Sequence, residues 1–98
     1  MIATSSIVET IVRKYGPVEK IILFGSHARN EADEYSDLDL IIIKETNQSF
    51  IERLVSVPRL SVHADIFVYT PTEFKQMKEN ENPFIIHALE GSKIIYEK

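Results

Sequence analysis

Cysteine is absent from this chain of 98 residues, and so is any long hydrophobic run. Without thiols the chain has no disulfide framework and no thiolate metal site, and a reducing compartment is compatible with it. The opening residues, MIATSSIVET, contain no basic region followed by a long apolar stretch, so we see no signal peptide. The apolar runs are far shorter than a membrane span. We therefore expect a cytoplasmic protein with no membrane partner.

Positive charge is also scarce. The 11 lysines and arginines are outnumbered by 15 aspartates and glutamates, the formal net charge is −4, and no basic run appears. A protein that grips long nucleic acid usually carries a basic patch, so we expect no direct nucleic-acid binding. A nucleotide held with a metal ion stays compatible with this composition, because the metal brings its own positive charge.

The remaining composition is that of a globular domain, with 44% hydrophobic and 27% charged residues. We expect a single domain over residues 1–98 of the α+β class, with a small mixed central sheet flanked by helices. The hydrophobic spacing predicts helices at 4–15, 50–57, 71–79 and 84–89, and strands at 21–24, 38–43, 60–69 and 94–96. Ser6 and Glu9 fit a capping box for the first helix, and Thr70 and Glu73 fit one for the third.

Two aspartates stand one residue apart where the second strand begins. Side chains alternate between the faces of a strand, so the carboxylates of Asp37 and Asp39 point the same way and Leu38 points the other way. Oxygens of both residues can meet one hard cation, and Mg²⁺ takes such ligands together with phosphate oxygens and waters. A solvated strand start is the alternative for a D-x-D sequence considered alone.

A glycine and a serine end the preceding strand. Gly25 lets the backbone approach a bulky anion, and Ser26 offers a hydroxyl and a backbone N–H where a helical turn begins. An ordinary capped turn is the alternative if the pair is considered alone. Phosphate at Gly25 and Ser26, with metal at Asp37 and Asp39, describes a nucleoside triphosphate with its magnesium.

Asp65 is the best candidate for a third carboxylate. It lies in the predicted third strand, in the run HADIFVYT, where apolar neighbours make an unpaired charge costly. If this strand pairs beside the second, Asp65 can face the same cations, and two Mg²⁺ ions then become the expectation. A charge on an edge strand is the alternative for Asp65.

These residues resemble a known family. Gly25-Ser26, ten residues and then Asp37-Leu38-Asp39 match the signature of the DNA polymerase beta-type nucleotidyltransferase superfamily. The longer stretch GSHARNEADEYSDLDL looks like the minimal nucleotidyltransferase branch. That branch often has glycine where this chain has Asn30, and asparagine tolerates the left-handed backbone angles that such a turn needs.

The resemblance implies an activity and a partner. Many members of this branch are antitoxins encoded beside a HEPN-domain toxin, and some transfer AMP from ATP to a tyrosine of that toxin. The resemblance therefore implies a magnesium-dependent protein adenylyltransferase that uses ATP. It implies metal ligation by Asp37, Asp39 and Asp65, and nucleotide contact by Gly25 and Ser26.

Other side chains near the motif carry weaker expectations. Arg29 could contact phosphate, or it could pair with Glu31 or Asp33. His63 lies two residues before Asp65, although a solvent-facing histidine is the simpler interpretation. His27 and His87, in contrast, have no partners at metal-ligand spacing, so we assign them no metal role.

Three functions follow from these residues. Little of the chain remains to build a pocket for a second substrate, so we expect another molecule, in a homo- or hetero-oligomer, to complete the acceptor site. A toxin that is itself the acceptor satisfies this requirement. The alternatives are an antitoxin that neutralises by binding alone and a small-molecule nucleotidyltransferase, such as one that modifies an antibiotic, working with a separate subunit.

Overall fold

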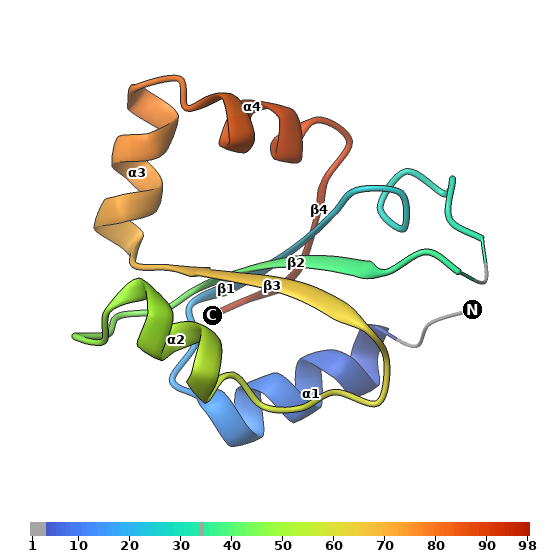
Figure 1. The fold of residues 1–98 in the computed structure, drawn as a ribbon, viewed down its shortest axis with the longest axis horizontal. Helices are drawn as coiled ribbons and strands as arrows, with labels where there is room; N and C mark the ends of the chain where they lie inside the picture. The colour runs from blue at the N-terminus through green and yellow to red at the C-terminus, as the bar shows by residue number, and fades with distance from the viewer. Residues whose placement is uncertain (1–3, 34) are drawn as a thin grey trace.

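The computed structural model describes residues 4–33 and 35–98. These residues form four helices and four strands (Figure 1). In chain order they are α1 (Thr4–Tyr15), β1 (Lys20–Phe24), β2 (Leu38–Ile43), α2 (Phe50–Ser56), β3 (Ala64–Tyr69), α3 (Pro71–Glu79), α4 (Pro83–Leu89) and β4 (Lys93–Glu97). The predicted α+β class and the type of every element are confirmed.

The strands form one mixed sheet in the order β3-β2-β1-β4. β1 pairs antiparallel with both β2 and β4, whereas β2 and β3 run parallel, and α2 lies in the connection between them. Strands β3 and β4 form the two edges of the sheet. Strand β3 begins at Ala64, four residues later than predicted, because the chain bends at Ser61 and Val62 before the pairing starts.

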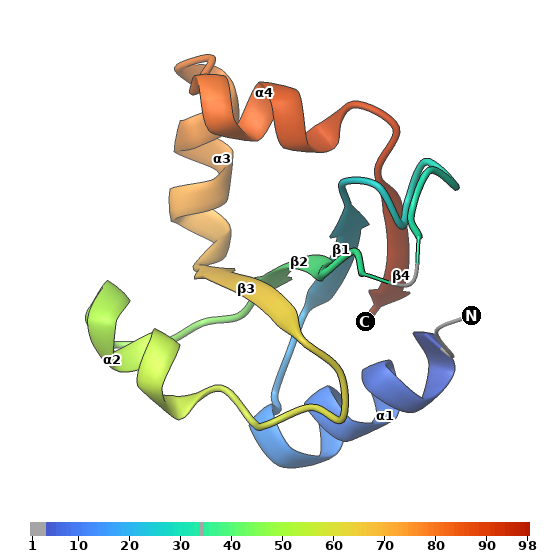
Figure 2. The same ribbon diagram turned by 45° about the vertical axis from the view of Figure 1, so that its right-hand side comes forward.

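The sheet separates two hydrophobic cores. Helix α1 packs through Ile7 and Ile11 against one face, where Ile42 lies at the centre. Helices α3 and α4 cover the other face, where Ile41 contacts the cluster that contains Ile85 (Figures 1 and 2). Because neighbouring residues of a strand point to opposite faces, the continuous apolar run of β2 serves both cores.

The helix caps agree with the sequence only in part. Thr70 and Glu73 form the predicted capping box of α3, and Ser49 and Glu52 form another at α2. The capping box predicted for Ser6 and Glu9 is wrong, because α1 is already helical from Thr4 and the Ser6 carbonyl accepts a hydrogen bond from the Thr10 hydroxyl. None of the helices in the described part of the chain is long and apolar enough to cross a membrane.

Helix α2 is oriented by a buried arginine. Arg53 is only 6% exposed. Its guanidinium donates hydrogen bonds to both carboxylate oxygens of Glu73 on α3, at 2.6 and 3.1 Å. It also donates to the backbone carbonyls of Gln48 and Val68. The Arg53 guanidinium holds the pKa of Glu73 below its usual value. This pair ties α2 and α3 to the end of β3.

Neutralising Glu73 should therefore weaken the fold in a pH-dependent way. We expect Glu73→Gln to lower the free energy of unfolding at pH 7 by about 1 kcal/mol, a modest value because the carboxylate is partly solvated. The lowered folded-state pKa makes this stabilisation complete above the ordinary glutamate value of 4.5 and lost as the pH falls through the lower folded-state value. Urea unfolding at pH 7 and pH 3.5 measures both effects.

The matched control is Glu79→Gln on the same helix. Glu79 pairs with Lys75 at 3.9 Å on the exposed surface, so its loss should change stability by less than about 0.5 kcal/mol at either pH. An equal effect of the two substitutions would contradict the role given to Arg53 and Glu73.

Candidate active site

The predicted site residues meet at one end of the sheet. Gly25 directly follows β1, Asp37 directly precedes β2, and Asp39 and Asp65 are the second residues of β2 and β3. The parallel register places Asp39 opposite Asp65, and the antiparallel register places Phe24 opposite Asp39. In Figure 1 these positions lie where β1 ends and where β2 and β3 begin. The condition set from the sequence, that β3 must pair beside β2, is met.

Gly25 is in close contact with Asp39. The glycine has φ of +75°, and a Cβ atom at this position would lie 2.2 Å from the Oδ2 atom of Asp39. A side chain here would therefore displace the carboxylate and would also strain the backbone. The Gly25 carbonyl then accepts hydrogen bonds from the amides of Ala28 and Arg29, which closes the turn after β1. The glycine is thus required both by the turn and by the carboxylate.

The turn after Gly25 keeps its shape as expected. Asn30 has φ of +60°, which is the left-handed conformation that we expected asparagine to tolerate at this point. The Ser26 carbonyl accepts a hydrogen bond from the Glu31 amide at 2.9 Å, so this turn is closed by its own backbone. Ser26 itself is half-buried, and it lies at the end of the sheet that carries the candidate carboxylates.

Negative charges gather around Asp39 in this site. Partial burial raises the pKa of Asp39 above its ordinary value, and the negative charges of Asp65 and Asp37 raise that pKa further. His27 and Arg29 act in the opposite direction and lower it. Asp37 and Asp65 are exposed, whereas Asp39 is half-buried between them and the Gly25 turn. The strand register has thus brought like charges together, and a cation would relieve their repulsion.

Two basic side chains flank these carboxylates. Arg29 forms an ion pair with Glu31, one of the two arrangements foreseen for it, and its stem lies against Gly91 after α4. The Nε2 atom of His27 lies 3.1 Å from the carbonyl oxygen of Ser36, so the imidazole ties the glycine turn to the residues before β2. The sequence predicts no metal role for His27. Its position inside the motif is the one sequence feature that indicates a contact near the site.

The carboxylates of this site suit magnesium, although they do not form a complete metal coordination shell by themselves. Within the described residues, no group of three or more His, Cys, Asp or Glu side chains is placed to hold a metal ion. Mg²⁺ usually takes only one or two protein carboxylates and completes its shell with waters and substrate phosphates. Asp39 and Asp65 supply carboxylate oxygens from adjacent strands, and the glycine leaves room for the Asp39 carboxylate. The residues therefore fit the ion.

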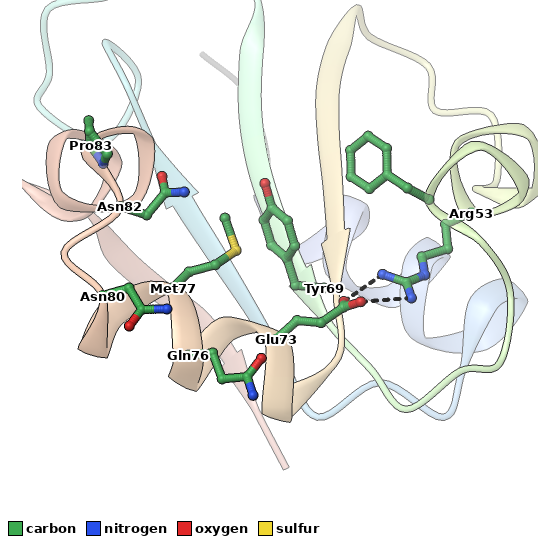
Figure 3. Close-up of a pocket in the computed structure, with 9 residues that line it drawn as sticks. Arg53, Tyr69, Glu73, Gln76, Met77, Asn80, Asn82 and Pro83 are labelled. Carbon is green, nitrogen blue, oxygen red and sulfur yellow. Dashed lines mark hydrogen bonds and ion pairs between the residues drawn. The ribbon is translucent and has the colours of Figure 1, made fainter.

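A hollow lies away from these residues, at the opposite end of β3 from Asp65. It has a volume of about 530 Å³ and is lined by Phe50, Arg53, Tyr69, Glu73, Gln76, Met77, Asn80, Asn82 and Pro83. Figure 3 shows Arg53 reaching from α2 to Glu73 on α3 along its wall. Tyr69 stands four residues beyond Asp65 on the same strand. This hollow thus includes none of the predicted site residues, and the ion pair between Arg53 and Glu73 in its wall has a structural role.

Comparison with known proteins agrees with this geometry. The family model for polymerase beta nucleotidyltransferases matches residues 7–98. A relative from Methanocaldococcus jannaschii, MJ0604, is 30% identical over 95 residues, which cover 96% of this chain and 95% of that protein. A second from the same organism, MJ1305, is 36% identical over 87 residues. Both carry the provisional name protein adenylyltransferase.

Other similarities are shorter or more distant. The alignment covers 80% of this chain but only 58% of MJ1305, so the chain spans little more than half of that relative. MntA of Haemophilus influenzae, also provisionally named a protein adenylyltransferase, is 42% identical over 48 residues, which cover 49% of this chain and 42% of that protein. A crystal structure of a provisionally assigned nucleotidyltransferase from Sulfolobus solfataricus has the same fold, with a TM-score of 0.65 and 18% identity over 97% of this chain and 78% of that one. With a family match over nearly its whole length and a relative aligned from end to end, this chain belongs to the polymerase beta nucleotidyltransferase family.

Proposed function

We propose that this chain is a magnesium-dependent protein adenylyltransferase, which moves AMP from ATP onto a tyrosine hydroxyl of a HEPN-type toxin and thereby acts as its antitoxin. The register that sets Asp39 against Asp65, with Gly25 in contact with the Asp39 carboxylate, is the observation that carries the proposal. The names of the relatives support transfer of an adenylyl group to a protein. Tyrosine, the toxin and magnesium rest on the resemblance of the motif.

The turn after β1 is suited to hold the triphosphate. Glycine at position 25 lets the backbone approach the phosphates, and Ser26 contributes a hydroxyl beside them. His27 keeps this turn against the segment before β2 through its contact with the Ser36 carbonyl. Arg29 lies close enough to influence the charge of Asp39 and can exchange Glu31 for a phosphate oxygen. The turn thus orients the nucleotide toward the carboxylates.

The carboxylates serve the transfer itself. When bound, magnesium neutralises phosphate charge and stabilises the leaving pyrophosphate. Asp37, Asp39 and Asp65 would hold magnesium beside the phosphates, with Asp39 oriented by the Gly25 turn. The acceptor oxygen forms a bond to the α-phosphorus while the bond to the pyrophosphate oxygen breaks. Asp65, exposed on the outer strand, can receive the proton of the attacking hydroxyl at a carboxylate oxygen.

Removing one carboxylate should stop the transfer without unfolding the protein. With ATP, magnesium and a purified HEPN-type toxin, we expect the toxin to gain the mass of one AMP group or more. Asp39→Asn should reduce the rate by about a hundredfold or more, because the amide no longer holds the cation in the charged site. Intact-mass spectrometry and a rate series with ATP measure the effect.

The control for charge is Glu45→Gln, which removes one exposed carboxylate just beyond the far end of β2 and should leave the rate unchanged. Full transfer by Asp39→Asn would refute the catalytic assignment. If Asp39→Asn lost transfer but still neutralised the toxin in cells, neutralisation would depend on binding, and the antitoxin role would not require catalysis.

The glycine should prove as important as the carboxylate beside it. We expect Gly25→Ala to destabilise the fold by about 1–2 kcal/mol and to abolish most of the transfer, because the methyl group meets the Asp39 carboxylate at a positive φ. Gly91→Ala is the control, since Gly91 also has a positive φ, of 69°, but faces only the flexible stem of Arg29. Gly91→Ala should lose similar stability but retain more activity, because its methyl group would move the Arg29 side chain and would leave the Asp39 carboxylate in place. Urea unfolding and transfer rates measure both effects.

A further inference from the structure

Helix α2 presents its apolar side chains to solvent. Ile51 is 68% exposed and Val55 is 81% exposed, and Phe50 and Leu54 are also exposed. Spacings of three and four residues place Ile51, Leu54 and Val55 next to one another on the helix surface. We call these four residues the α2 patch. The α2 patch does not face the core, and an exposed apolar patch of this kind is typical of an interaction surface.

The outward orientation of the α2 patch is held by Arg53. Its guanidinium is buried by the carbonyls of Gln48 and Val68 and by the carboxylate of Glu73. Rotating α2 to bury the patch would break these contacts and would leave charged groups without partners. The exposed patch is therefore a fixed feature of the packed structure.

A groove leads from the α2 patch to the candidate active site. It has a volume of about 310 Å³ and is lined by Leu54, Val57, Ala64, Asp65, Ile66 and Phe67. Consecutive residues of β3 take part, so the groove follows the outer edge of this strand, and β3 pairs with β2 on one side only. Figure 2 shows α2 beside β3 at this edge of the sheet. Leu54 of the patch thus lines one wall of the groove, and Asp65, the carboxylate opposite Asp39, lines another.

We propose that the α2 patch and this groove, together the acceptor groove, dock the protein that receives the adenylyl group. The inference rests on the proposed function. An apolar segment of the acceptor lies against Leu54 and Val57, and its hydroxyl-bearing residue reaches Asp65. Continuity between the patch and Asp65 favours the acceptor over a second copy of this chain, since a copy seated there would block access to the carboxylate.

The test is a pair of charges placed on the most exposed part of the α2 patch. The double variant Ile51→Glu/Val55→Glu should fold normally, because both side chains lie in solvent. We expect it to raise KM for the HEPN-type toxin about tenfold or more, while ATP binding measured by calorimetry stays unchanged. The control is Ile94→Glu, which places a charge on an apolar residue of β4 that is 55% exposed, and it should leave KM unchanged.

A binding measurement separates docking from catalysis. The Asp39→Asn chain should capture the toxin in biolayer interferometry as well as the wild type does, and adding the two α2 substitutions should weaken capture about tenfold. If the wild type transfers no AMP but capture still depends on α2, the proposed function fails and the docking inference stands. If transfer and capture are unaffected by the α2 substitutions, the docking inference is overturned and the proposed function stands.

The absence of cysteine permits a direct check of location. Val55→Cys can carry one photo-crosslinker as the only thiol in the chain, and Ile94→Cys is its control. We expect Val55→Cys to crosslink the toxin close in sequence to the residue that receives AMP, and Ile94→Cys to crosslink weakly. Crosslinks from Val55→Cys to a second copy of this chain, with a dimer that the α2 charges dissociate, would overturn the inference in favour of self-association.

Discussion

Parallel pairing of β2 with β3 is the constraint on which the rest of the structure depends. It sets Asp39 opposite Asp65, and a slip of one residue would turn one of these carboxylates to the other face of the sheet. The register is held by burial on both sides, since Ile41 and Ile42 are fully buried in different cores. Strand β1 then fixes the position of the glycine turn, because the pairing of Phe24 with Asp39 places Gly25 against the Asp39 carboxylate.

The same arrangement assigns different tasks to the two ends of β3. At its beginning the strand carries Asp65 beside Asp39, where partial solvation allows these like charges to approach each other. At its end the Val68 carbonyl receives Arg53, which joins α2 and α3 through Glu73. The ion pair between Arg53 and Glu73 stabilises the scaffold at a distance from the candidate site. It also leaves the apolar side of α2 available to the acceptor that we propose.

Much of this could be predicted from local patterns. The apolar runs before Gly25 and after Asp37 indicated two buried strands, and the spacing between them indicated that both ends belong to one site. Asn30 was expected to take a left-handed conformation, and its φ of +60° confirms it. The orientation of α2 could not be predicted, because it depends on Arg53 meeting Glu73, twenty residues away. The contact of His27 with the Ser36 carbonyl was missed for a similar reason, since it depends on how the loop returns to β2.

The sequence by itself determined the elements of this protein and the chemistry available to it. Hydrophobic period, caps and the positions of glycine act over a few residues, so they specify helices, strands and turns without knowledge of the whole. The residue types of the motif likewise define which functional groups are available to the site. Only the tertiary structure decided that Asp65 faces Asp39, that Gly25 must leave room for a carboxylate, and that the apolar side of α2 stays in solvent. Each of these depends on contacts between segments distant in the chain, and their free energy appears only when the strands and helices pack together.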